Sequence, residues 1–168
     1  MAVRGQFFIL GSVFLLILFT SLFLLLPKEG EAGSRIGLFA ENLKLEIPRA
    51  FNLDPDGLSG WTGWFRERVE ERGIRAEVLW VYTLPQGRVV IGNFLGEDRK
   101  LKLVIDGEGL EVEIRDGEVQ EIDRDLPERF ELEVEGFLKE ELKGGRPNLL
   151  LWFRLEDGKG RVQETAIF

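Results

Sequence analysis

The chain contains no cysteine and no histidine among its 168 residues. The lack of cysteine excludes a disulfide framework and any thiolate nucleophile or thiolate metal site. The lack of histidine removes the most common general base and the most common metal ligand in proteins. The sequence also has no G-x-S-x-G, no H-E-x-x-H and no phosphate-binding glycine motif. We therefore expect a protein that is not an enzyme.

Basic charge is in short supply. The first 27 residues hold one charged residue, Arg4, and residues 28–168 carry 21 basic against 30 acidic residues. Nucleic-acid binding requires a basic surface for the phosphates, so we expect no nucleic-acid partner. Asn and Gln number four each and Met one, whereas Glu, Arg and Lys are abundant. This bias is typical of thermophilic proteins, in which ion-pair networks contribute at high temperature.

One long apolar run is present near the start of the chain, where residues 7–26 contain no charge. Twenty residues of helix span about 30 Å, the thickness of the hydrocarbon core of a bilayer. A removable secretory signal has a shorter apolar core and then a small-residue cleavage site, which "PKEGEAGS" does not supply. The sequence therefore predicts a retained transmembrane helix in residues 1–27, ended by Pro27. Arg4 favours a cytoplasmic N-terminus, with residues 28–168 outside the cell membrane.

Small residues interrupt this run at Gly11 and Ser12. Small residues let two helices approach closely in lipid, so these two positions are a candidate helix-packing interface. The alternative is that both are ordinary tolerated residues of a single anchor.

The stretch "RGQFFILGSVFLLILF" resembles the N-terminus of archaeal type IV pilin-like proteins. Their class III signal combines a short basic leader, a Gly, and a Gln that opens a long apolar helix. The resemblance implies cleavage between Gly5 and Gln6 by a prepilin peptidase on the cytoplasmic side, with the helix retained in the mature subunit. It further implies that the helices bundle into a filament core below β-rich heads. The Ser and the acid that many pilins carry early in the mature chain are replaced here by Phe8 and Leu10.

Residues 28–75 are predicted to form a linker with one or two short amphipathic helices. In "SRIGLFAENLKLEIP" four apolar residues have helical spacing: Ile36, Phe39, Leu43 and Ile47. Ser34 is the expected N-cap and Pro48 the expected stop, after which "RAFNLDPDGLSG" reads as a loop. The letters "LKLEI" also fit a strand.

A second helix is predicted in "SGWTGWFRERVEERG", ended by Gly73. Its apolar face consists of Trp61, Trp64, Phe65 and Val69. Trp61 and Trp64 are candidate interface residues, because aromatic rings favour the membrane headgroup level. Packing in the core of the β domain is the favoured alternative, because the charged face of this helix has as many acids as bases and would gain little from anionic lipid.

Residues 76–168 are predicted to form an antiparallel β-sandwich, which makes the protein mainly β outside its membrane helix. About eight short strands are separated by turn sequences such as "LPQG", "DGEG" and "EDGKG". The expected strands cover residues 77–83, 88–94, 100–105, 110–114, 118–122, 129–137, 148–155 and 161–168. Short strands joined by hairpin turns are the signature of a sandwich or a barrel. The chain ends in "AIF", which predicts either a buried final strand or an exposed edge that pairs with a neighbouring subunit.

We expect no cofactor, and calcium is the one candidate for which the sequence offers ligands. Asn52, Asp54 and Asp56 alternate ahead of Gly57, as in the first half of a calcium-binding loop. The bidentate acid that completes such a loop is missing, since Gly63 stands in its place. A plain turn before the second helix explains the same letters.

These observations predict a membrane-anchored, extracytoplasmic structural or interaction protein. Its expected partners are the lipid membrane and other subunits, in a homo- or hetero-oligomer with pilin-like or membrane proteins. The first alternative is a permanently anchored β domain that binds a partner in an envelope or membrane complex. The second is a membrane-tethered metal-dependent hydrolase or binding protein that uses Asp54 and Asp56.

Overall fold

The computed structural model describes residues 32–168 except positions 86 and 145, with side chains from Arg35 onward. The predicted transmembrane segment, residues 1–27, lies outside the described residues. Within the described residues, no helix has the length and apolar character needed to cross a membrane.

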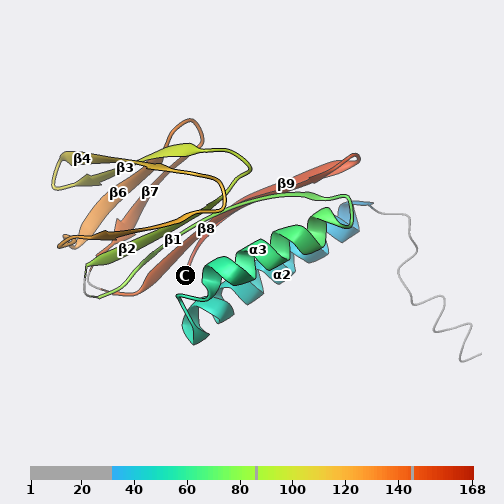
Figure 1. Cartoon of the computed structure of the whole chain (residues 1–168), viewed down its shortest axis with the longest axis horizontal. Helices are drawn as coiled ribbons and strands as arrows, with labels where there is room; N and C mark the ends of the chain where they lie inside the picture. Colours follow the sequence, from blue (N-terminus) through green and yellow to red (C-terminus); the bar gives the residue numbers. More distant parts are fainter. Residues whose placement is uncertain (1–31, 86, 145) are drawn as a thin grey trace, which may run out of the picture. The chain divides into compact units, whose positions relative to one another are not determined.

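Two helices precede nine strands in the described part of the chain (Figure 1). The helices are α2 (Ala32–Leu53) and α3 (Leu58–Glu70). The strands are β1 (Arg75–Thr83), β2 (Arg88–Phe94), β3 (Arg99–Ile105), β4 (Glu108–Ile114), β5 (Val119–Asp123), β6 (Arg129–Val134), β7 (Leu138–Lys143), β8 (Asn148–Asp157) and β9 (Gly160–Ile167).

The strands form two antiparallel sheets, with the orders β5-β2-β1-β8-β9 and β4-β3-β6-β7. The helices pack on one face of the five-stranded sheet, and the four-stranded sheet packs on its other face, so there are three layers (Figure 1). The predicted antiparallel, sandwich-like arrangement is confirmed. The prediction of a mainly β domain is too narrow, because the long covering helices make the fold mixed α/β.

The central strands of the five-stranded sheet are buried on both faces. In β1, Val78, Trp80 and Tyr82 face the helices, whereas Leu79 and Val81 face the second sheet. Two-sided burial removes the need for polar residues at alternate positions, which explains the continuous apolar run "VLWVY". In β6 only one face is covered, and its burial alternates strictly along the strand.

The hairpins β1–β2, β3–β4 and β8–β9 are paired as the turn sequences predict. Asp106 and Gly107 form the β3–β4 turn with φ of 51° and 82°, and a two-residue turn with two positive φ angles matches the twist of its strands. The strands β4 and β5 follow each other across "DG" but belong to different sheets, so this turn does not form a hairpin. The strand β7 was not predicted as a separate element.

Helix α2 is longer than the sequence predicts. It begins before Ser34 and continues through Pro48 to Leu53, so neither residue bounds the helix and residues 49–53 are helical instead of a loop. Ile47 and Phe51 are both buried against the sheet, one turn apart on either side of the proline. This packing continues the apolar face past Pro48 and outweighs the hydrogen bond that the proline cannot make.

Helix α3 lies where it was predicted and buries Leu58, Thr62, Phe65 and Val69. Gly73 follows it with φ of 75°, the left-handed conformation expected of the stop residue. The helix packs over β1, where the Trp80 ring lies against the backbone of Gly92 on β2. A Cβ atom at position 92 would lie 2.2 Å from that ring, so only glycine fits there.

Candidate functional site

Four of the residues singled out from the sequence lie outside the described residues. They are the processing pair Gly5 and Gln6 and the small residues Gly11 and Ser12. Cleavage and helix packing at these positions remain predictions.

The structure places the three candidate calcium ligands around the turn between α2 and α3. Asn52 belongs to the last turn of α2, and Asp54 and Asp56 follow it, all three with exposed side chains. Asp56 is 3.3 Å from the Arg88 guanidinium, which also pairs with Glu121 at 2.6 Å. No group of three or more acidic residues in the described ranges is placed to hold a metal ion. Calcium binding at these residues remains a prediction.

The two candidate interface tryptophans have different environments. Trp61 is partly buried against the helix-side core, and its ring stacks on Phe65 with centroids 5.5 Å apart. Trp64 lies three residues further along α3, and its relative exposure is 57%. Trp61 therefore belongs with the core, whereas Trp64 presents an aromatic surface to whatever lies outside the helix layer.

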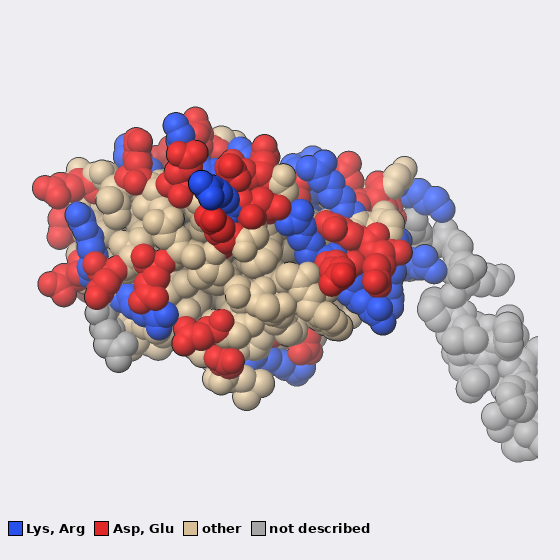
Figure 2. Space-filling model, viewed as in Figure 1, with Lys and Arg blue, Asp and Glu red and all other residues tan. Residues whose placement is uncertain are grey.

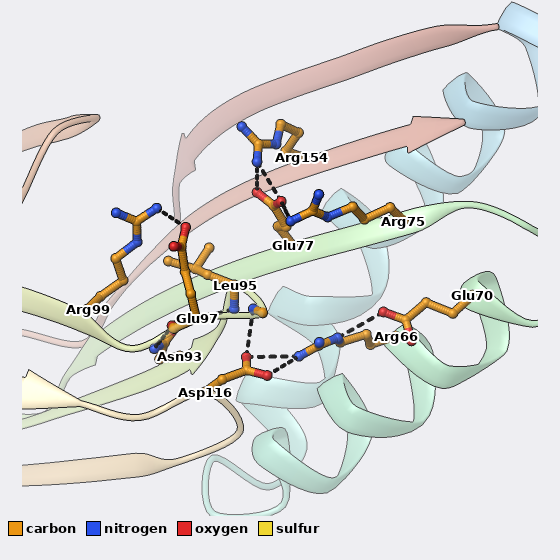
Figure 3. A network of polar contacts seen from close by, with 11 residues as sticks. Arg66, Glu70, Arg75, Glu77, Asn93, Leu95, Glu97, Arg99, Asp116 and Arg154 are labelled. Atoms are coloured by element: carbon orange, nitrogen blue, oxygen red, sulfur yellow. Dashed lines mark hydrogen bonds and ion pairs between the residues drawn. The ribbon is translucent and has the colours of Figure 1, made fainter. Parts of the chain in front are cut away.

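A row of polar side chains crosses the five-stranded sheet beyond the end of the apolar core. Glu77 of β1, Arg154 of β8 and Gln163 of β9 are direct neighbours in register, on the face turned to the second sheet. Glu77 is 4% exposed, and Nη2 of Arg154 contacts both of its carboxylate oxygens: it donates a hydrogen bond to Oε1 and forms an ion pair with Oε2 (Figure 3). Arg75 lies 3.0 Å from the same carboxylate. Two guanidinium groups therefore hold the Glu77 carboxylate.

The same row lines a cleft of about 250 Å³ between the two sheets. Arg99 and Phe137 form its opposite side, and the Arg99 guanidinium stacks 5.4 Å from the centre of the Phe137 ring. Nε of Arg154 and Nε of Arg99 are buried without a hydrogen-bond acceptor. Glu97 pairs with Arg99, and the lining itself carries two acids, Glu77 and Glu135, and two bases, Arg99 and Arg154. The arrangement closes the end of the sandwich core.

A second network joins α3 to the loops between the sheets. Nη1 of Arg66 lies 2.9 and 3.0 Å from the two Asp116 oxygens, and Nε donates to Glu70 at 3.0 Å (Figure 3). The backbone N–H of Gly96 donates to Asp116 at 2.7 Å. Burial by itself would lower the pKa of Arg66, but its hydrogen bonds to Glu70 and Asp116 outweigh burial and hold the pKa above its usual value. Arg66 therefore stays charged and fastens the helix layer to the sheets.

Asn93 fixes the point where the chain crosses between the two sheets. Its side-chain amide donates to the carbonyls of Ile114 and Glu97 at 3.0 and 2.9 Å, and its oxygen accepts from Leu95 N–H at 3.1 Å. Asn93 is fully buried. Its amide supplies hydrogen-bond partners for backbone groups that have no partner in a neighbouring strand where the chain leaves the sheet. Sequence reasoning missed this residue and the Glu77–Arg154 pair. A signal was present, since each interrupts or ends an otherwise apolar strand.

The strand β9 forms an open edge of the five-stranded sheet. Among the described strands it has one neighbour, β8. Leu149 and Phe168 exchange both backbone hydrogen bonds, at 3.1 and 2.9 Å. Hydrogen-bonded pairs recur at every second residue of an antiparallel ladder, so the backbone N–H and C=O groups of the even-numbered residues of β9 point toward β8. The N–H and C=O groups of the odd-numbered residues point away from the sheet: Arg161, Gln163, Thr165 and Ile167.

The charged surface is predominantly acidic. Figure 2 shows Asp and Glu side chains spread over the visible face, with an uncharged area between them. The outer face of the four-stranded sheet carries cross-strand ion pairs, such as Lys139 with Glu131 at 3.0 Å and Arg129 with Glu141 at 3.0 Å. Pairs of this kind keep a sheet face soluble and contribute little to stability.

Comparison of this chain with protein-family models, with curated proteins and with solved structures gives no match.

Proposed function

We propose that the protein is a membrane-anchored structural or interaction protein whose head, residues 33–168, lies outside the cell membrane. The observation that carries this proposal is the uncharged run of 20 residues at 7–26, joined by a short segment to a helix that is built into the head. A chain that holds such a run in lipid keeps its head at the membrane surface.

The attachment of α2 to the head supports this role. Five of its residues are buried at regular helical spacing on the five-stranded sheet: Ile36, Ala40, Leu43, Ile47 and Phe51. Lys44 of α2 also forms an ion pair with Glu164 of β9 at 2.9 Å. Because α2 is part of the head's core, a pull on residues 1–31 would act on the whole sheet. This is what a tether or a filament subunit requires.

The form of this function that we favour is a pilin-like subunit. Its support is the class III-type sequence at Gly5 and Gln6, followed by an apolar run and a β-rich head. The alternative is a permanently anchored head that binds a partner in an envelope complex. The two forms differ in the first residue of the mature chain.

Membrane fractionation of the full-length chain in its native host tests the anchor. The wild-type protein should sediment with membranes and resist extraction by alkaline carbonate, and protease added outside intact cells should digest its head. The double variant Leu15→Arg, Leu16→Arg should appear in the carbonate supernatant, because each charge at a helix centre costs about 3 kcal/mol of insertion free energy. The matched variant Leu15→Met, Leu16→Met should stay in the membrane. A wild-type chain found in the soluble fraction would overturn the proposal.

Mass spectrometry of the purified native protein then separates the two forms. A chain that begins at Gln6 supports prepilin processing and the pilin-like subunit. A chain that begins at Met1 supports the permanent anchor.

A further inference from the structure

The outer edge of β9 is the least protected strand edge in the described part of the protein. Unpaired strand edges attract other strands, and proteins usually block them with short strands or with charged side chains. The edge strand β5 has only five residues and includes Glu121 and Asp123. The edge strands of the other sheet, β4 and β7, carry alternating charges in "EGLEVEI" and "LKEELK".

The strand β9 lacks such protection over most of its length. From Gln163 to the end of the chain the one charged side chain is Glu164, and Lys44 pairs with it at 2.9 Å. No proline or bulge interrupts the eight residues of Gly160–Ile167, which pair continuously with β8. Ile167 and Phe168 are about half exposed, at 49% and 48%. The result is a continuous row of outward-pointing backbone groups with apolar residues at one end.

We propose that this edge binds the same edge of a second copy of the chain, with the two β9 strands antiparallel about a two-fold axis at Gln163. The pairing would join the two five-stranded sheets into one continuous sheet. Identical edges can pair in this way because an antiparallel, two-fold arrangement makes each edge its own partner. This inference rests on the proposed role as an interaction protein and names its partner.

Charge and hydrogen-bond parity select the position of the axis. Only odd-numbered residues of β9 point their backbone groups outward, so an odd residue must pair with an odd residue. With the axis at Gln163, Arg161 lies opposite Thr165 of the second copy, and Glu164 lies opposite Val162. With the axis at Glu164, the two Glu164 carboxylates would face each other, and like charges in directly opposite positions destabilise a sheet. An axis at Gln163 or at Thr165 avoids this contact, and the axis at Gln163 pairs more of β9, residues 160–166 as compared with residues 163–167.

Cysteine cross-linking of the full chain in native membranes tests this pairing, because the natural sequence contains no cysteine. The variant Gln163→Cys places its thiol opposite the same thiol of the second copy, within the Cα–Cα reach of a disulfide. The matched variant Thr165→Cys has the same orientation, but its two Cα atoms would be four residues apart along the strand, roughly 13 Å. The variant Val119→Cys on the β5 edge reports random collision.

We expect mild oxidation to give a covalent dimer with Gln163→Cys and monomers with the other two variants. In the Gln163→Cys background, Thr165→Pro should abolish the dimer, because it removes an outward N–H without removing a bond to β8. If Thr165→Pro does not fold, Ile167→Lys supplies the second readout, since it adds a charge beside the edge without changing its backbone and should reduce the dimer fraction severalfold.

A chain with Gln163→Cys that stays monomeric would overturn the inference, and so would equal cross-linking at all three positions. A covalent dimer with the Thr165→Cys variant but not with the Gln163→Cys variant would overturn the position of the axis at Gln163. Carbonate extraction of the same samples reads the membrane anchor separately. If the Gln163→Cys chain is soluble and still forms the covalent dimer, only the membrane anchor is contradicted. If that chain is membrane-bound and forms no dimer, only the β9 pairing is contradicted.

Discussion

Glu77 and Arg154 face each other across neighbouring strands at the end of the sandwich core. They are direct partners in the β1–β8 register, and their side chains form an ion pair with 6% and 28% of the side-chain surface exposed. Arg75 adds a second, more exposed partner for the same carboxylate. The pair closes the core where Leu79 and Trp152 end the apolar layer. The two members are not equivalent: Glu77 without Arg154 would still have Arg75, whereas Arg154 without Glu77 would lose its partner in the pair.

The variant Glu77→Leu should therefore destabilise the protein strongly. Removal of one member of a buried ion pair leaves the other charge uncompensated, and we expect a loss of about 3 kcal/mol in the free energy of unfolding. The partial exposure of Arg154 places the loss at the lower end of the usual range. The measurement is a guanidinium unfolding titration of the full chain in detergent, with tryptophan fluorescence as the readout.

The double variant Glu77→Leu, Arg154→Leu is the control for this prediction. Apolar residues of similar volume can replace a buried ion pair at little cost, so the double variant should recover most of the loss. Equal losses for the single and double variants would contradict the prediction and assign the effect to packing.

Thr62 carries a buried hydrogen-bond chain between α3 and β1. Its hydroxyl donates to the Leu58 carbonyl at 2.8 Å and accepts from Trp80 Nε1 at 3.1 Å. Thr62→Val keeps the volume but leaves the Trp80 N–H buried without an acceptor, so the free energy of unfolding should fall by about 1–3 kcal/mol. Thr62→Ser keeps the hydroxyl and should lose less. Thermal unfolding of both variants decides the matter, and an equal loss for Val and Ser would show that the hydroxyl is not the cause.

Pro48 lies inside α2, where its ring removes the backbone hydrogen bond to the Lys44 carbonyl. Because the helix continues on both sides, Pro48→Ala should restore that bond and raise the free energy of unfolding by about 1–3 kcal/mol. Leu45→Ala, at an exposed position of the same helix, should change it by less than about 0.5 kcal/mol. A Pro48→Ala variant no more stable than the wild type would mean that the half-buried ring contributes as much packing as the bond is worth. Denaturant titration measures both variants.

The strands that are covered on one face could be predicted from the sequence. Phe130, Leu132 and Val134 are buried and the acids between them are exposed, as the alternation in β6 indicates. The helical face of Ile36, Leu43 and Ile47 was also correct, because helical spacing identifies a buried stripe without further information. Local pattern sufficed wherever one element has one buried face.

The layer order could not be predicted in the same way. A run such as "LLLWF" in β8 shows that both faces are buried, but it does not say that helices cover one face and a second sheet the other. The end of α2 was misplaced for a related reason, since the packing of Phe51 beyond Pro48 is a tertiary contact. The crossing of the chain from β4 to β5 depends on the hydrogen bonds of Asn93, which join segments about 20 residues apart. Long-range contacts of this kind leave no local pattern.

The only tyrosine of the chain, Tyr82, should make the protein less stable at alkaline pH. Burial raises the pKa of its phenol; the nearby Arg88 charge lowers it, and the Asp56 and Glu121 charges raise it further. The folded protein therefore keeps the phenol neutral at a pH where the unfolded chain, with the ordinary pKa of about 10, already ionises it. The contribution of Tyr82 to stability is complete below about pH 10 and is lost as the pH rises through the higher folded pKa. The free energy of unfolding, measured from pH 8 to 11, should fall more steeply for the wild type than for Tyr82→Phe. Lys44 should cause a similar alkaline loss, because hydrogen bonds to Glu41 and Glu164 raise its pKa. That loss is the same in both proteins, so the comparison cancels it. Tyrosinate absorbance that appears near pH 10 while the chain is still folded would contradict the assignment.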